Sequence, residues 1–99
     1  MANQQRNRTL QQTHTTLRGD EVLASAREFF ARESGIYSAF LEKEGPTFVN
    51  LRGLGGEEIV VGVSDAPGGT AVTASSYMFD QQVARFLSSL PRTVAPVTA

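Results

Sequence analysis

Glycine turns divide the middle of this chain into short segments, and this spacing limits the fold more than any other feature. Eight of the nine glycines lie where one predicted segment ends and the next begins, and only Gly62 lies inside a segment. Glycine adopts the positive φ angles that tight turns require, so these positions predict turns. Because short turns join antiparallel neighbours, we expect the segments between Gly35 and Asp80 to pair as an antiparallel sheet.

Helical spacing of apolar residues occurs on the two flanks of this region. Residues 20–35 begin with Asp20, a good capping residue, and then place apolar side chains three and four positions apart. A second helix is predicted at 80–90, capped by Asp80 and stopped by Pro91. The strands are predicted at residues 36–42, 47–52, 58–64 and 70–78. The predicted fold class is α+β: an antiparallel meander of four or five strands with two helices packed on one face, in the order α-β-β-β-β-α.

The N-terminal segment differs in composition from the rest of the chain. Residues 1–19 contain three arginines and no acidic residue, whereas residues 20–99 contain six basic and ten acidic residues. The segment has too few large apolar side chains for a core of its own. We interpret residues 1–19 as a polar, basic arm, residues 20–91 as a single domain and residues 92–99 as a short tail. The "THTTL" stretch of the arm is β-branched enough to add as a strand to an open sheet edge.

Cysteine and histidine, the usual zinc ligands and catalytic bases or thiol nucleophiles, are scarce. The chain has no cysteine, and its one histidine, His14, lies in the arm with no acidic residue before Asp20, so we expect no metal site. The glycine-rich stretch at 53–58 lacks the third glycine and the helix of a dinucleotide fingerprint and the lysine of a phosphate loop, which favours a hairpin turn. Two acidic pairs flank predicted turns, where water surrounds them: Glu42 with Glu44, and Glu57 with Glu58. We therefore expect no enzyme activity and no cofactor.

Charge and hydropathy also narrow the choice of partner. The three arginines of the arm would give only weak, salt-dependent attraction to nucleic acid, and no aromatic residue lies among them to stack on bases. Nucleic-acid binding therefore ranks third among the functions considered. The apolar runs fall far below the ~20 residues that a membrane-spanning helix needs. Because no apolar segment follows the first arginines, we expect a cytoplasmic protein.

Alternation along the strands predicts two apolar faces on the sheet. One set of alternate residues is expected to face the helices: Ala39, Leu41, Val49, Leu51, Ile59, Val61, Val63, Val72 and Ala74. The opposite parity contains Ser38, Phe40, Phe48, Asn50, Val60, Thr73 and Tyr77. Two helices cover only one face of such a sheet, so the second face calls for another cover: the arm of the same molecule, a second copy, or a different subunit.

These faces predict a non-catalytic interaction or accessory subunit. It would dock on a larger assembly, or self-associate, through the sheet face and the N-terminal arm. The candidate partner-binding residues are Arg6, Arg8, Leu10, Leu17, Arg18, Phe40, Phe48, Val60 and Tyr77.

A family resemblance gives an alternative function. From about Pro46 to Leu90, the order of strands, the "GGTAVTASSY" stretch and the final "FDQQVARFLSSLP" helix resemble the C-terminal half of START-like domains of the polyketide cyclase and dehydrase type. The resemblance implies a sheet with a helix across it and, in complete members, an apolar cavity for lipids, sterols or polyketides. This chain would then be a small binder of an apolar ligand, held between the sheet and the stripe of Val83, Phe86, Leu87 and Leu90. In the competing interpretation these four side chains fill the core. The resemblance assigns no site residue to this chain.

Overall fold

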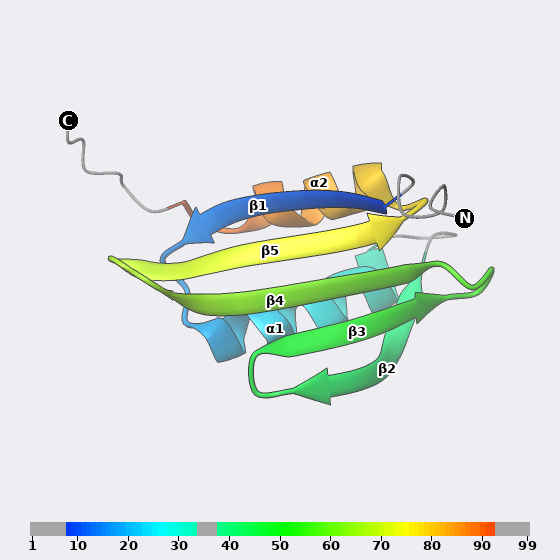
Figure 1. Cartoon of the computed structure of the whole chain (residues 1–99), viewed down its shortest axis with the longest axis horizontal. Helices are drawn as coiled ribbons and strands as arrows, with labels where there is room; N and C mark the ends of the chain where they lie inside the picture. The colour runs from blue at the N-terminus through cyan, green and yellow to red at the C-terminus, as the bar shows by residue number, and fades with distance from the viewer. Residues whose placement is uncertain (1–7, 34–37, 93–99) are drawn as a thin grey trace.

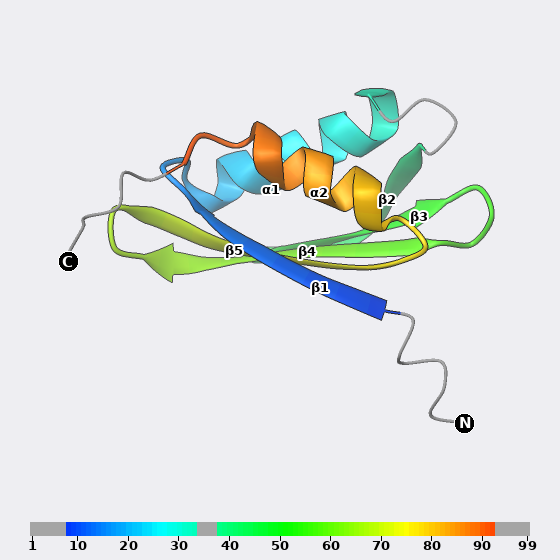
Figure 2. The same cartoon turned by 90° about the horizontal axis from the view of Figure 1, so that it is seen from above.

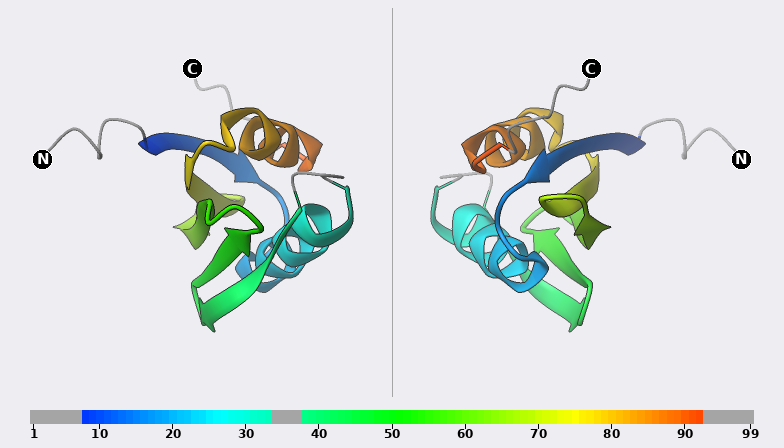
Figure 3. Two further views of the ribbon diagram at one scale, coloured as in Figure 1. Left: turned by 90° about the vertical axis from the view of Figure 1, so that its right-hand side faces the viewer. Right: turned by 90° about the vertical axis from the view of Figure 1, so that its left-hand side faces the viewer.

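A sheet and a layer of helices make up the fold, as the alternation and the helical spacing predict (Figures 1 and 2). The computed structural model describes residues 8–33 and 38–92. The elements are β1 (Arg8–Thr15), α1 (Gly19–Glu28), a π-helical turn η2 (Phe29–Glu33), β2 (Ala39–Gly45), β3 (Phe48–Gly53), β4 (Glu58–Ala66), β5 (Gly69–Tyr77) and α2 (Asp80–Ser89). Viewed end-on, both helices lie on the same side of the sheet (Figure 3).

The sheet is antiparallel and has five strands in the order β1-β5-β4-β3-β2. Strands β2 to β5 form a meander, and β1 pairs with β5 along its whole length, from Arg8 opposite Tyr77 to Thr15 opposite Thr70. The predicted fold class is thus confirmed, with five strands. Because β1 lies within residues 1–19, this part of the segment interpreted as an arm belongs to the folded sheet. It forms one edge of the sheet, and β2 forms the other.

Local boundaries differ from the predicted ones at three places. Helix α1 begins at Gly19, and the backbone N–H of Arg18 donates a hydrogen bond to Glu21 Oε1 at 2.8 Å, so Asp20 is a first-turn residue and not the cap. Helix α2 likewise has Phe79 at its N-cap. Strand β2 runs to Gly45, three residues beyond its predicted end, and a bulge between Leu41 and Lys43 shifts its register against β3. The predicted helix end at Gly35 lies outside the described residues.

The core lies between the sheet and the two helices. Helix α1 packs against β3 and β4, and α2 packs against β1 and β5. Rings of Phe29, Phe30 and Phe86 meet where the helices approach each other, with centroids 5.2 to 5.5 Å apart. The predicted helix-facing residues are buried except Leu41, which is exposed on the bulged edge strand, and Val63, which is partly buried.

The apolar stripe of α2 belongs to this core. Val83, Phe86, Leu87 and Leu90 are each at most 6% exposed and pack with the buried residues of the sheet. The space between α2 and the sheet is therefore filled by the chain's own side chains, as the core interpretation predicts.

The glycine-rich stretch forms the turn between β3 and β4. Gly53 N–H donates to the carbonyl oxygen of Glu57 at 2.8 Å, and Gly56 N–H donates to the carbonyl oxygen of Gly53 at 3.1 Å. Gly56 has a φ of +92°, which a side chain would disfavour. The loop thus reverses the chain, as predicted.

None of the helices in the described part of the chain has the length and apolar character to cross a membrane.

Candidate functional site: the open face and the apolar end

The face of the sheet that points away from the helices, here called the open face, carries five of the predicted site residues. Figure 1 looks onto this face, with both helices behind the sheet. Leu10 is 66% exposed, Phe40 49% and Tyr77 39%, whereas Phe48 and Val60 are half-buried. Each side chain is held by its strand register, so the spacing of the apolar groups is fixed by the sheet.

Exposed apolar side chains gather at one end of the sheet. At this end β2 and β4 begin, β3 and β5 end, and β1 begins, since Phe40 lies opposite Arg52, Arg52 opposite Glu58, and Arg8 opposite Tyr77. The large hydrophobic residues that are exposed in the described chain are Leu10, Phe40, Leu41, Leu54, Tyr77 and Met78. All six belong to this end or to the turns that close it, and we call this group the apolar end.

A charged network divides the apolar residues on the open face. Arg52 donates from Nη2 and Nε to Glu42 Oε1, at 2.9 and 3.2 Å, and from Nη1 to the carbonyl oxygen of Gly56 at 3.1 Å. The hydrogen bond with Glu42 raises the pKa of Arg52 above its usual value. Along the end row of the sheet, Arg52 and Glu58 lie between Phe40 and Tyr77. The open face is therefore a mixed surface in which fixed charges separate two apolar areas.

Asn50 is the neighbour of this network on β3. Its Nδ2 donates to Glu58 Oε2 at 3.0 Å, while its Oδ1 is buried and has no hydrogen-bond partner among the described residues. A buried acceptor without a donor costs about 1–3 kcal/mol. Asn50 thus joins Glu58 to the network through its amide nitrogen, at the cost of one unsatisfied buried acceptor.

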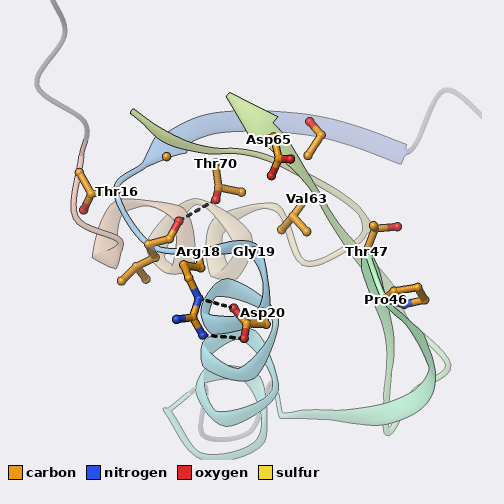
Figure 4. A pocket seen from close by; sticks show the side chains of 12 residues that line it. Thr16, Arg18, Gly19, Asp20, Pro46, Thr47, Val63, Asp65 and Thr70 are labelled. Atoms are coloured by element: carbon orange, nitrogen blue, oxygen red, sulfur yellow. Dashed lines mark hydrogen bonds and ion pairs between the residues drawn. The ribbon is translucent and has the colours of Figure 1, made fainter. Parts of the chain in front are cut away.

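The opposite end of the sheet is polar and is hollowed by a groove of about 480 Å³ (Figure 4). It lies between the start of α1, the β2–β3 turn, the end of β4 and the start of β5. Arg18 Nε and Nη2 donate to the two carboxylate oxygens of Asp20 at 3.1 and 2.9 Å. This hydrogen-bonded pair lowers the pKa of Asp20 and raises that of Arg18. The charge of Arg18 is therefore already matched within the groove.

The side chains that line the groove form no metal-ligating cluster among the described residues. Its remaining polar side chains include Ser64 and Asp65, but His14 is not among the residues that line it. Within residues 8–33 and 38–92, no three His, Cys, Asp or Glu side chains come close enough to hold a metal ion. We therefore place the candidate site on the open face and the apolar end.

The structure separates the predicted site residues into three groups. Leu10, Phe40, Phe48, Val60 and Tyr77 share the open face. Leu17 packs against the core, and Arg18 lies at the polar end, so neither adjoins that face. Arg8 starts β1, and Arg6 lies outside the described residues.

Sequence reasoning missed three members of the apolar end. Leu41 has the parity of a core residue, but it is exposed beside the bulge. Leu54 lies in a glycine turn, and Met78 follows β5 with a φ of 75°. A large apolar residue inside a predicted turn was the available signal, because a turn gives it no core to enter.

The fold and the surface define an α+β domain whose antiparallel sheet is covered by helices on one side and open on the other. Comparisons with models of protein families, with curated proteins and with solved structures found no match to this chain.

Proposed function

We propose that this chain is a non-catalytic interaction or accessory subunit that docks onto a protein surface through the apolar end and the open face. The observation that supports the proposal most directly is the gathering of six large exposed apolar side chains at one end of the sheet. Burying apolar surface contributes roughly 25 cal/mol per Å². A patch of this kind on an otherwise polar surface is typical of a protein contact site.

The aromatic residues are the expected anchors of the contact. Phe40 and Tyr77 stand on strands of a hydrogen-bonded sheet, so little conformational freedom is lost when a partner covers them. The network around Arg52 supplies polar contacts between them. A partner can be a different subunit or a second copy of this chain.

The test compares Tyr77→Ser with Thr47→Ala, a change at the polar end of the sheet. We expect the wild type to sediment with a concentration-dependent mass, or to co-purify with a protein partner from its source. Tyr77→Ser should lose that association, and Thr47→Ala should keep it. Thermal unfolding of both variants checks that the fold is retained.

Two results would contradict the proposal. The first is a wild type that stays monomeric at high concentration and co-purifies with no protein. The second is an association that survives Tyr77→Ser and Phe40→Ser together. An apolar compound found in a native mass spectrum would instead favour the START-like alternative.

A further inference from the structure

The outer edge of β1 is a second surface, distinct from the open face. Thr15 lies opposite Arg92, and Thr16 N–H donates to the carbonyl oxygen of Pro91 at 3.3 Å. Backbone groups of successive strand residues point to opposite edges, so this contact sets the pattern for the whole strand. The N–H and C=O groups of the even-numbered residues point outward, and those of the odd-numbered residues point to β5.

The rest of the sheet agrees with this pattern. Val63 N–H donates to the carbonyl oxygen of Thr47, so the odd-numbered residues of β4 face β3 and the even-numbered ones face β5. Val60 lies opposite Ser75 on β5, and the next residue of β5, Ser76, lies opposite Thr9. The odd-numbered residues of β5 therefore face β4, and its even-numbered residues face β1. Because the odd-numbered residues of β1 lie opposite these even-numbered residues, their backbone groups point to β5.

The outward groups of β1 thus belong to Arg8, Leu10, Gln12 and His14. Among the described residues, Pro91 and Arg92 are the only ones that pair with this edge, and they do so at its end. Within residues 8–33 and 38–92, no strand is therefore paired with the rest of this edge.

A groove of about 170 Å³ runs beside this edge. It is lined by residues 11–13 of β1, by Ala84, Leu87 and Ser88 on the flank of α2, and by Arg92. An added strand lies about 4.8 Å from its neighbour. The groove therefore occupies the place where the side chains of such a strand would meet α2.

The positive charge of Arg92 favours an acidic segment as the occupant of the groove. Among the described residues that line the groove, Arg92 is the only charged one. It is exposed and makes no ion pair with any described residue. From Thr9 to Thr15, β1 has no acidic or permanently basic side chain. A segment that carries a carboxylate beside Arg92 would complement this edge.

A second copy of the chain fits this edge poorly. Its β1 brings no acid to meet Arg92. Its β2 has acids, but Glu42 and Glu44 are already paired with Arg52 and Arg27, and a bulge breaks the regular edge of the strand.

We propose that the outer edge of β1 binds an extended segment of another protein as an added strand, with an acidic residue of that segment paired to Arg92. Main-chain hydrogen bonds to Leu10, Gln12 and His14 supply the affinity, and the groove and Arg92 supply the selectivity. This surface does not depend on the docking role proposed for the open face.

The experiment follows amide hydrogen exchange of the full chain by NMR with two synthetic peptides. One is Glu-Val-Thr-Val-Thr-Val-Thr-Glu, and the other has lysine in place of both glutamates. In the free protein, the amides of Leu10, Gln12 and His14 should exchange quickly, and those of Gln11 and Thr13 slowly. The acidic peptide should protect the fast amides and bind at least about tenfold more tightly than the basic one.

Three variants of the chain test whether the peptide binds at this edge. Arg92→Glu should reverse the preference between the two peptides. Gln12→Pro removes one outward N–H and should abolish peptide protection while the remaining spectrum stays folded. Tyr77→Ser should leave peptide binding unchanged, so failure here is distinguishable from failure of the open-face proposal.

Three outcomes would overturn the inference. The fast amides could already be protected in the free protein, which would show that the chain itself fills the edge. The second outcome is that neither peptide protects these amides at millimolar concentration. The acidic peptide could keep its advantage in Arg92→Glu.

Discussion

The two edge strands of the sheet differ in how well they are protected against pairing with a further strand. Strand β2 carries Glu42, Lys43 and Glu44 in a row, has a bulge, and ties both acids to arginines of neighbouring elements. Strand β1 pairs with β5 without a register shift, and from Thr9 to Thr15 it has no acidic or permanently basic side chain. Charges and bulges on an edge strand discourage the addition of another strand. In the described part of the chain, one edge of this sheet is thus protected by charges and a bulge, and most of the other edge has no paired strand.

A glycine lies at a close approach on each side of the sheet, and the two substitutions should differ in cost. At Gly69 a Cβ would meet the backbone of Thr15, the last residue of β1, whereas at Gly45 it would meet the ring of Phe48. Backbone cannot move aside as a ring can. We expect Gly69→Ala to lower the free energy of unfolding by about 3 kcal/mol or more and Gly45→Ala by about 1–3 kcal/mol, as measured by urea unfolding.

Equal costs at the two glycines would show that the end of β1 shifts as easily as the Phe48 ring. The approach of β1 to β5 would then be looser than the structure indicates, and the contrast between the edges would weaken.

Two proline substitutions in β1 test which edge its backbone groups face. Thr13→Pro removes an N–H directed at β5 and should cost about 1–3 kcal/mol of unfolding free energy. Gln12→Pro removes an outward N–H and should cost much less. Thermal unfolding of the two variants, measured side by side, gives the comparison. If Gln12→Pro is the more damaging change, the assignment of outward groups is wrong.

The smallest effect is expected at the ion pair of the β2 edge. Arg27 Nη1 lies 2.8 Å from Glu44 Oε1, and both side chains are about half exposed. A double-mutant cycle with Arg27→Ala and Glu44→Ala should give a coupling of about 0.2–1 kcal/mol that falls in high salt. A coupling of zero would mean that this pair does not stabilise the edge, and its protection would rest on the bulge, Lys43 and the pair of Glu42 with Arg52.

Turn chemistry and alternation made most of the fold predictable. The glycines from Gly53 to Gly56 predicted a hairpin, because few other residues accept the φ found at Gly56. Alternation predicted that Val49 and Val61 face the helices, because side chains alternate between the faces of a strand. These are local rules, and they apply wherever a strand has a strong apolar pattern.

Strand β1 has no such pattern. Its residues on the helix side include Gln11, which donates to the carbonyl oxygen of Asp80 at 3.0 Å, and Thr15, which is fully buried. Hydropathy cannot detect a strand that is held by backbone pairing and polar contacts. Composition therefore indicates an arm at this segment, although its β-branched character also suggests a strand.

The candidate site was predictable only in part for a related reason. Phe40 and Tyr77 follow from the parity of their strands. Leu17 and Arg18 are predicted only because residues 1–19 are treated as one binding segment. The chain turns at residues 16–18, and this turn carries both residues away from the open face. The gathering of apolar residues at one end depends on which strand ends coincide, and that is a property of the register.

The separation of the two sheet faces has a consequence for how this chain tolerates change. Val60 and Val61 are adjacent in sequence, yet one contributes to the exposed face and the other to the buried core. Substitutions at sites without shared contacts have nearly additive effects on stability. The chemistry of the open face can therefore change at every second residue of a strand while the neighbouring positions preserve the scaffold.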